Sequence, residues 1–488
     1  MIVFRPLLLS FLVSSALCGC AVGPSSSPRS TLALPPMTVV DNDAITGAPA
    51  VPRWWRLYGD ATLDALVIQA LENNRDLRVA SANLRSAYAV LREREGDRLP
   101  TTAVSSDVGY GSTMSDQIAA ALEQTEVRTG QRYGGGFATG WSLDLFGRIA
   151  RSIQAARADA EAIQATEDSV RVVVAAETTR AYVESCGYAS RADIAHRSLA
   201  LVSRSLELKT AQRDAGDATS LDVARAAALV EQTRAAIPAL EAGRQNALYA
   251  LAVLTGRTPD DLPADATSCA AVPQLDTPLP IGDVTALLQR RPDIREAQRR
   301  LEASTARIGV ATASLYPTVS ILGTVASSAP TPGGLTDHGS IAWNLGPALS
   351  WRFPNSSAAR AQIADAEAQE HAALARFDAV ILATLKDVKQ ALATYQAALR
   401  QHAALKTAAV QSGEALRLAQ VGRRAGAASE LDVLEAERRD VEAQAMAASA
   451  EAEIAADQIA LFRSLGGGWE QAPAVHLPTI TRSDDAAR

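Results

Sequence analysis

The second half of the sequence repeats the first, and this duplication limits the chain to folds built from two similar units. Three blocks of identity align the copies. At an offset of 217 residues, Asp76, Arg78, Leu84, Pro100 and Thr101 meet Asp293, Arg295, Leu301, Pro317 and Thr318. Ala-Asp-Ala-Glu-Ala at 158–162 recurs at 364–368, and Leu-Asp-Val at 221–223 recurs at 431–433. Each copy therefore predicts a short helix, two extended segments, a long helix, a tight turn and a second helix.

Two long stretches without proline, 152–213 and 358–423, are rich in alanine, glutamate, arginine and glutamine and predict helices. At about 1.5 Å per residue, each would extend roughly 90–100 Å. In the second stretch, large apolar side chains recur every three or four residues, as in a coiled-coil seam. They are Leu374, Phe377, Ile381, Leu385, Val388, Leu392, Tyr395 and Leu399. Neighbouring helices are expected to pack along this seam.

Each long stretch ends at an Ala-Gly pair, 215–216 or 425–426, which is a helix C-terminal signal. Thr219-Ser220 and Ser429 can then cap the returning helices. The result is two long antiparallel helical hairpins. Pro238 lies inside the first returning helix and predicts a kink or a break there.

The extended segments alternate between large apolar and small or polar residues. The alternation is clearest in Phe137–Phe146 and Ile341–Phe353, and weaker in Thr101–Gly111 and Val319–Ser327. Such segments of about ten residues are typical of transmembrane β-barrels, although a soluble sheet with one buried face would alternate similarly. Four strands cannot close a barrel, and an open sheet edge is not tolerated in lipid. Membrane strands would therefore require several copies of the chain to share one barrel.

The N-terminus resembles a bacterial lipoprotein signal. Arg5 precedes an apolar stretch at 7–17, which is too short to span a bilayer, and Leu17-Cys18-Gly19-Cys20 follows. We expect cleavage before Cys20 and acylation of that cysteine, and Ala21 resembles the residue that directs lipoproteins to the outer membrane. An ordinary signal peptide with an incidental cysteine is the alternative.

The composition argues against several classes of function. A net charge of −7 gives no reason to expect nucleic acid, and no apolar run reaches transmembrane length. We find no metal-ligand cluster, P-loop, nucleophile elbow or dinucleotide fingerprint. No catalytic activity, metal or cofactor is therefore expected, apart from the lipid on Cys20. Cys186 and Cys269 would face an oxidising compartment, which permits a disulfide between them and leaves two free thiols as the alternative.

Several motifs resemble those of the TolC-type outer-membrane efflux proteins, in the NodT-like lipoprotein branch that serves resistance-nodulation-division pumps. They are Trp54-Trp55, Gly-Trp-Ser-Leu-Asp-Leu-Phe-Gly-Arg at 140–148, Arg-Arg-Pro-Asp-Ile at 290–294, Gly426 and Leu-Asp-Val-Leu-Glu-Ala at 431–436. The resemblance implies a mainly α-helical fold with a small transmembrane β part. It also implies a homotrimer with a twelve-stranded outer-membrane barrel and a hollow periplasmic helical barrel. The implied partners are outer-membrane lipid, a periplasmic adaptor and an inner-membrane pump.

The resemblance also assigns a constriction to the hairpin tips, at the positions of Asp432 and Glu435. These two residues are three apart and share a helix face, so three chains would place six carboxylates near one axis. The alternative is a solvated helix start in which the helix dipole stabilises Asp432. In the first hairpin Asp222 matches Asp432, but Arg225 replaces the second acid.

The chain departs from relatives that close the tip with an aromatic and a basic residue, because Arg423 and Ala428 occupy those positions. We hypothesise that Arg423 or Arg424 pairs instead with Asp214 or Asp217 of the first hairpin. Residues 354–357, Pro-Asn-Ser-Ser, also replace the glycine-rich turn of relatives, which leaves the junction between strand and helix open.

The predicted function is a passive exit duct of a tripartite efflux system. A duct for a secreted polypeptide or for metal ions is an alternative within the same fold. A lipid-anchored periplasmic coiled-coil scaffold or adaptor is an alternative from another class, but it leaves Trp141, Trp343 and Trp351 on one-sided strands unexplained.

The sequence divides into six segments. They are a signal peptide (1–19), a lipid-anchored segment (20–60), a first repeat (61–257), a linker (258–282), a second repeat (283–467) and a tail (468–488). In the first repeat we expect strands at about 101–111 and 133–146 and helices at about 148–213 and 219–255. In the second, we expect strands at about 317–328 and 341–353 and helices at about 356–423 and 429–463.

Overall fold

A computed structural model describes residues 21–30, 32, 44–261, 264–275, 277–282, 289–353 and 356–478 of the chain. The expected signal peptide and Cys20 lie outside the described residues, as does the end of the tail from residue 479. The chain divides into two compact units. The first contains residues 85–162 and 297–377 with the N-terminal segment up to Ser30, and the second contains residues 31–84, 163–296 and 378–488.

The long helices form two antiparallel pairs with matching boundaries. Helices α5 (Arg148–Asp214) and α6 (Ser220–Leu254) form one hairpin, and α10 (Ser357–Arg424) and α11 (Glu430–Ser464) form the other. Both returning helices have 35 residues. The shorter helices α3 (Arg75–Gly96) and α9 (Pro292–Ala313) have 22 residues each. The structure therefore repeats where the sequence repeats.

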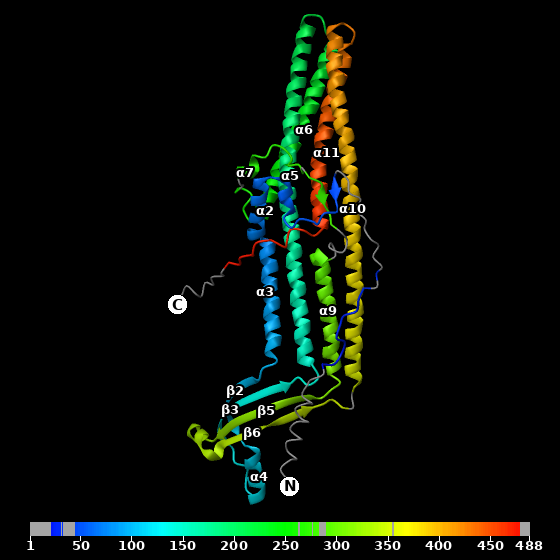
Figure 1. Cartoon of the computed structure of the whole chain (residues 1–488). Helices are drawn as coiled ribbons and strands as arrows, with labels where there is room; N and C mark the ends of the chain where they lie inside the picture. The colour runs from blue at the N-terminus through cyan, green and yellow to red at the C-terminus, as the bar shows by residue number, and fades with distance from the viewer. Residues whose placement is uncertain are drawn as a thin grey trace. The chain divides into compact units, whose positions relative to one another are not determined.

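Both hairpin turns use a glycine with positive φ. Gly216 and Gly426 have φ values of 86° and 75°, a conformation that residues with a Cβ rarely adopt. The next N–H in each turn, from Asp217 or Ala427, bonds the carbonyl of Gln212 or Gly422 at 2.7 and 2.8 Å. This is the Schellman pattern, which satisfies the last helical carbonyls. Figure 1 shows the two turns at the same end of the hairpins.

Pro238 does not break α6. The helix runs unbroken from Ser220 to Leu254 with the proline inside it. The predicted break is therefore absent, because packing on both sides of the proline holds the helix. Leu229, Val230, Ile237 and Leu248 are buried along it.

The first unit contains a four-stranded antiparallel sheet in the order β2-β3-β5-β6 (Figure 1). Its strands are β2 (Thr101–Gly111), β3 (Gly130–Leu143), β5 (Thr318–Ala329) and β6 (Ile341–Ser350). The repeats meet at the centre of the sheet, where β3 of the first pairs with β5 of the second. Among the residues that the structure describes, the outer strands β2 and β6 each have one edge without a partner strand.

Strand β3 ends at Leu143, three residues before the expected end at 146. The reason is Asp144, whose carboxylate accepts from the N–H groups of Ile149 and Ala150 at 2.9 and 2.7 Å and thereby caps the start of α5. The sequence also missed α4 (Met114–Glu123) between β2 and β3. Thr113 and Asp116 form a capping box at its first turn, and this T-x-x-D spacing was the available signal.

The core of the second unit gathers around the N-terminal 3₁₀ turn η1 (Trp54–Tyr58) and helix α2 (Ala61–Asn73). Trp54 is fully buried and stacks on Phe462 of α11 at 4.6 Å between ring centroids. Strand β1 (Ile45–Thr46) pairs in parallel with β4 (Leu279–Pro280) beside this core. The remaining short elements are α7 (Ala264–Thr267), η2 (Pro332–Thr336) and η3 (His338–Ser340).

The two repeats secure the end of the returning helix in equivalent ways. The Asn74 amide donates to the carbonyl of Leu254 at 3.1 Å, near the end of α6. Arg291 donates to the carbonyl of Ser464 at 2.6 Å, at the end of α11. Both contacts tie the returning helix to the start of the short helix, so each side chain satisfies a carbonyl that helix geometry leaves unpaired.

Within the described residues, no helix is long and apolar enough to cross a membrane.

Candidate channel wall and constriction site

The strand register separates the side chains of the sheet onto two contrasting faces. Cross-strand partners share a face, and Phe137 lies between Val104 and Val325, which in turn lies beside Trp343. The large residues of this apolar face are Val104, Val108, Tyr110, Tyr133, Phe137, Trp141, Leu143, Val319, Ile321, Val325, Ile341, Trp343, Leu345 and Leu349, with small or polar residues such as Ser106, Gly135, Thr139 and Ser327 between them. Most of its large side chains are solvent-exposed in the single chain, with Val104 at 84% and Trp343 at 75%, whereas Tyr133, Leu143, Val319 and Ile321 are half-buried. A contiguous surface of this kind requires lipid or protein to cover it.

The opposite face is made almost entirely of small or polar residues. It consists of Ala103, Ser105, Asp107, Gly134, Gly136, Ala138, Gly140, Ser142, Ser320, Thr324, Ala326, Ala342, Asn344, Gly346 and Ala348, with Leu322 as a large exception. A Cβ added to Gly134 would stand 2.3 Å from the Asp107 carboxylate, so this glycine makes room for the acid. The small-residue face is suited to line a water-filled passage.

Two tryptophans mark the helix-proximal end of the apolar face in the same way. The Trp141 indole N–H donates to the Arg98 carbonyl at 3.0 Å, just after α3. The Trp351 indole N–H donates to the Leu315 carbonyl at 3.1 Å, just after α9. An indole with its ring against apolar surface and its N–H satisfied is typical of a membrane interface.

Asp432 lies at the start of α11 and caps the helix. Its carboxylate accepts from the Ser429 N–H at 2.7 Å and from the Ser429 hydroxyl at 2.6 Å, while its own N–H donates to the Ser429 Oγ at 3.2 Å. The Ser429 hydrogen bonds lower the pKa of the Asp432 carboxyl. Asp222 and Thr219 form the same capping box in the first hairpin. Asp432 is thus a charged group with a structural role of its own.

Glu435 is partly exposed, and two arginines lie about one turn further along its own helix. It accepts from Arg438 at 2.8 Å and from Arg439 at 3.1 Å. The Arg438 contact lowers the pKa of the Glu435 carboxyl. Within one chain, therefore, Asp432 and Glu435 are both ionised and at least partly exposed at the hairpin tip, and Glu435 is partly neutralised by its neighbours.

A buried charged cluster lies next to this tip and was not predicted. Lys209 of α5, only 2% exposed at its side chain, forms an ion pair with Glu430 of α11. Arg423 of α10 pairs with the same Glu430. Glu437 is also buried, and Ser205 and Lys209 are its polar neighbours. Three helices from both hairpins therefore meet at one group of charges.

Burial shifts the titration of this cluster in opposite directions for its two kinds of charge. Burial lowers the pKa of the Lys209 ammonium and raises the pKa of the Glu437 carboxyl. The sequence contained one signal of this cluster. Lys209 is the single lysine of the first repeat (61–257), where every other guanidinium or ammonium side chain is an arginine. Its partners could not be read from spacing, since they belong to helices more than 200 residues away.

The hypothesised tip ion pairs take other partners within one chain. Arg423 pairs with Glu430, seven residues further along its own hairpin, and Asp214 pairs with the adjacent Arg213 at 2.6 Å. Among the described residues, neither Arg424 nor Asp217 forms an ion pair with the opposite hairpin. The physical reason is proximity, because Arg423 and Asp214 each find a partner within or beside their own turn.

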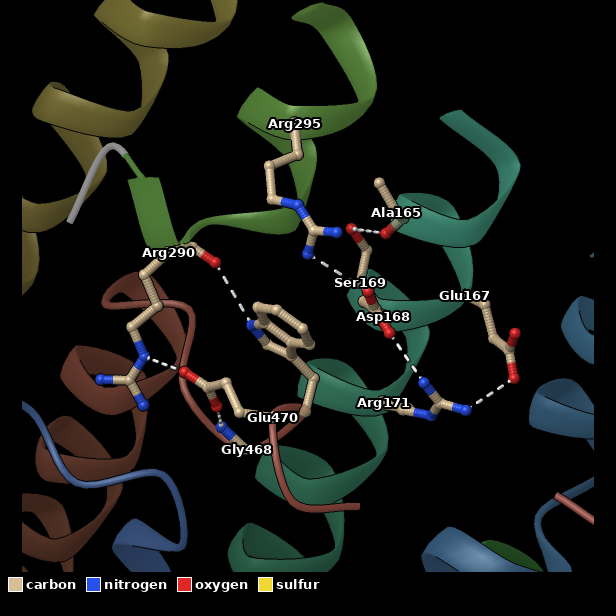
Figure 2. Close-up of polar contacts among 10 residues, drawn as sticks. Ala165, Glu167, Asp168, Ser169, Arg171, Arg290, Arg295, Gly468 and Glu470 are labelled. Carbon is tan, nitrogen blue, oxygen red and sulfur yellow. Dashed lines mark hydrogen bonds and ion pairs between the residues drawn. The ribbon is translucent and has the colours of Figure 1, made fainter. Parts of the chain in front are cut away.

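The Arg-Arg-Pro-Asp-Ile motif lies in a polar network that holds the segment after α11 (Figure 2). Arg290 pairs with Glu470, and the Trp469 indole N–H donates to the Arg290 carbonyl at 3.2 Å. The Arg295 guanidinium lies 4.7 Å from the Trp469 ring centroid and contacts buried Asp168 of α5 at 3.3 Å. The motif therefore joins α5, α9 and the end of the second repeat, and its role is structural.

Cys186 and Cys269 form a disulfide, with their Cα atoms 5.1 Å apart. Cys186 is fully buried in α5, and Cys269 follows α7 in the segment that joins the two repeats. The bond fastens that segment to the core of the second unit. The sequence permitted this pairing without requiring it.

A comparison with known protein families identifies the family of this chain. The sequence profile of the family described as "Outer membrane efflux protein" matches residues 66–257 and 284–467, once for each repeat. The chain belongs to the outer membrane efflux protein family. The protein is accordingly an outer-membrane protein.

Relatives in the family resemble the chain over most of its length. Outer membrane protein OprJ of Pseudomonas aeruginosa is 32% identical over 420 residues, which cover 86% of each chain. Nodulation protein T of Rhizobium leguminosarum bv. trifolii is 29% identical over 93% of this chain and 96% of the relative. The solved structure of the outer-membrane channel OprN matches with a TM-score of 0.84 and 35% identity, over 92% of this chain and 100% of that one.

Proposed function

We propose that the protein is the outer-membrane exit duct of a tripartite efflux system, passing small molecules from a periplasmic adaptor and an inner-membrane resistance-nodulation-division pump to the cell exterior. The observation that supports this most directly is the sheet with an apolar face and a small-residue face. A scaffold or adaptor has no use for such a sheet. The energy comes from the pump, and this chain performs no chemistry.

The two free edges of the sheet support assembly from several copies. In the described part of the chain, strands β2 and β6 have no partner strand on their outer edges, and unpaired backbone groups are costly in lipid. The strands alternate in direction, so β6 of one copy can pair with β2 of the next in the same antiparallel sense. Membership of the family favours three copies, which gives a twelve-stranded barrel with the small residues inside and the helical hairpins extending into the periplasm.

The N-terminal signal supports a second attachment to the membrane. Cleavage before Cys20 and acylation of its thiol would add a lipid anchor on the periplasmic side of the outer membrane. The proposal treats this lipid as an anchor only, and conduction depends on the barrel.

The acids at the hairpin tips support a cation-attracting constriction. In a trimer, Asp432 and Glu435 of each chain would form a ring of six carboxylates, and rings of this kind select for cations. The buried cluster around Lys209 lies beside this ring and would hold the two hairpins of one chain together. Arg438 and Arg439 moderate the charge of Glu435 without removing it.

Single-channel recording of the purified protein in planar bilayers tests both parts of the proposal. Asp432 also caps α11, so an alanine there would loosen the helix as well as remove charge. The variant Asp432→Asn/Glu435→Gln is preferable because the asparagine side-chain oxygen can still accept from the Ser429 N–H and so keeps the capping box. Asp222→Asn in the first hairpin is the matched control, since it changes an equivalent cap that lacks a second acid.

We expect small cation-selective steps from the parent and the control, and larger, less selective steps from the double variant. If the double variant conducts like the parent, the duct function is supported and the acidic ring is rejected. An absence of channels from folded, reconstituted protein would reject the duct and favour the scaffold.

A further inference from the structure

The first described residues of the chain, 21–29, lie along the helices of the first unit without forming a helix or strand. We call them the N-terminal strap. The Val22 N–H donates to the Phe146 carbonyl at 3.3 Å, in the turn between β3 and α5. The strap is therefore bonded to the place where the sheet ends and the long helix begins.

Three glycines make close contact where the strap meets the helices. A Cβ on Gly23 would stand 2.6 Å from the Cα of Gly309 in α9, and a Cβ on Gly147 would stand 2.7 Å from the Cα of Ala21. Contacts this short do not occur with a real side chain, so the strap fits only because these positions lack one. Gly23 and Gly147 also have φ values of 88° and 77°.

A buried arginine binds the main chain of the strap. Arg151 of α5 is 9% exposed, and its guanidinium donates to the carbonyls of Val22 and Gly23 at 3.4 and 3.5 Å and to the Gln154 side chain at 2.8 Å. A Cβ on Gly309 would stand 2.8 Å from the Cγ of Arg151, so the same glycine leaves room for both the strap and the arginine.

The contact continues beyond the glycines. Residues 25–30 line a cavity of about 610 Å³ together with polar side chains of α5 and α9. Those side chains are Gln154, Arg157, Glu161, Gln298, Arg299, Glu302 and Thr305. The surface under the strap is therefore polar and suited to a serine-rich segment with its backbone in contact.

We infer that Gly147, Arg151 and Gly309 form a binding seat for the N-terminus of this chain, which fixes the point where its lipid anchor joins the channel. The inference rests on the proposed acylation of Cys20, the residue directly before Ala21. The seat recognises main chain with a glycine at position 23, so it selects this terminus by shape as well as by hydrogen bonds.

The seat gives the anchor a defined position relative to the sheet. It lies at the β3–α5 junction, beside Phe146, which stacks on Tyr316 at 4.6 Å between centroids. In the proposed assembly this junction is where the barrel wall leaves the membrane on the periplasmic side. Acyl chains on Cys20 would then enter the leaflet next to the wall, and the anchor would hold the end of β3 at the membrane surface.

Trypsin cleavage after Arg29, followed by mass spectrometry of the released N-terminal peptide, tests the seat. The full-length protein is extracted from membranes and digested under native conditions. Gly23→Val alters only the strap, and Gly309→Val alters only the seat. Gly333→Val is the matched control, because a Cβ there meets nothing within 4 Å.

We expect release of the peptide to be at least tenfold faster for Gly23→Val and Gly309→Val than for the parent, and unchanged for Gly333→Val. Equal rates in all four proteins would overturn the seat. If Gly309→Val does not reach the folded state, Gly23→Val decides the question, since it leaves both helices intact.

The same experiment separates the seat from the proposed function. The mass of the released peptide reports directly whether Cys20 is acylated, and an unmodified peptide would overturn the link to a lipid anchor. Bilayer recordings of Gly23→Val should match the parent, because the strap lines no part of the small-residue face. Absence of channels in every protein would reject the duct. The protease result would still test the seat independently.

Discussion

Glu430 is the residue on which the two hairpins of a chain converge. Its carboxylate forms ion pairs with the buried ammonium of Lys209 in α5 and with the guanidinium of Arg423 in α10. Glu430 itself lies in the first turn of α11. A carboxylate there is favoured by the helix dipole as well as by the two cations. Removing it would leave Lys209 buried with Glu437 and Asp222 as carboxylate neighbours.

We predict that Glu430→Gln loosens the hairpin tips. Loss of one partner from a buried ion pair costs about 3–5 kcal/mol, so amide hydrogen exchange around Lys209 should be faster by more than tenfold. Asp214→Asn is the control, since Asp214 pairs on the surface with 63% of its side chain exposed and should change exchange little. Equal exchange in the two variants would show that Glu430 is dispensable.

The cation selectivity of the tip should resist moderate acid. Hydrogen bonds from Ser429 lower the pKa of Asp432, and Arg438 lowers the pKa of Glu435. Both carboxylates therefore stay ionised to a lower pH than an ordinary Asp or Glu side chain. Selectivity should be the same at pH 7 and pH 5 and should disappear only as the pH falls below about 4. Reversal potentials across a salt gradient measure this, and the Asp432→Asn/Glu435→Gln variant should show no such transition. A loss of selectivity already at pH 5 would contradict the assignment.

At the scale of elements, local signals in the sequence were sufficient to predict a helix end or a strand face wherever that feature depends on neighbouring residues alone. The Ala-Gly pairs at 215–216 and 425–426 place the hairpin turns, because only the glycine accepts the positive φ of the Schellman motif. Alternation in β3 and β6 likewise places the two faces of the sheet. The contacts that the sequence did not reveal, such as Lys209 with Glu430, depend on which helices become neighbours after folding.

The segment that joins the repeats is held by one covalent bond in addition to the pairing of β4 with β1. The disulfide closes a loop between residues 83 apart in sequence, and cross-links of this length contribute about 2–4 kcal/mol. We predict no free thiol at Cys186 or Cys269 in unreduced protein. Cys186→Ala/Cys269→Ala should unfold at a lower temperature or denaturant concentration than the parent. Two labelled thiols before reduction, or an unchanged unfolding midpoint in the variant, would contradict this.

At the scale of the whole molecule, the two faces of the sheet should respond oppositely to the same substitution. Val325 and Ala326 are adjacent in β5, and they lie on the apolar and the small-residue face respectively. Arginine on a lipid-facing strand position costs about 2–4 kcal/mol at the membrane centre, whereas a position facing water accepts it. We predict that Val325→Arg prevents assembly of a heat-modifiable oligomer, while Ala326→Arg assembles and conducts with altered selectivity. Equal assembly of both variants would mean that the faces are assigned incorrectly.

The free edges of β2 and β6 have a consequence for the life of the protein before assembly. A newly exported chain exposes two strand edges beside a continuous apolar surface, which is the arrangement that promotes aggregation. We therefore expect the chain to depend on a periplasmic chaperone that covers both edges from export until assembly. A cell that makes the protein faster than its copies can meet would be expected to accumulate aggregates and to depend on periplasmic proteases for their removal.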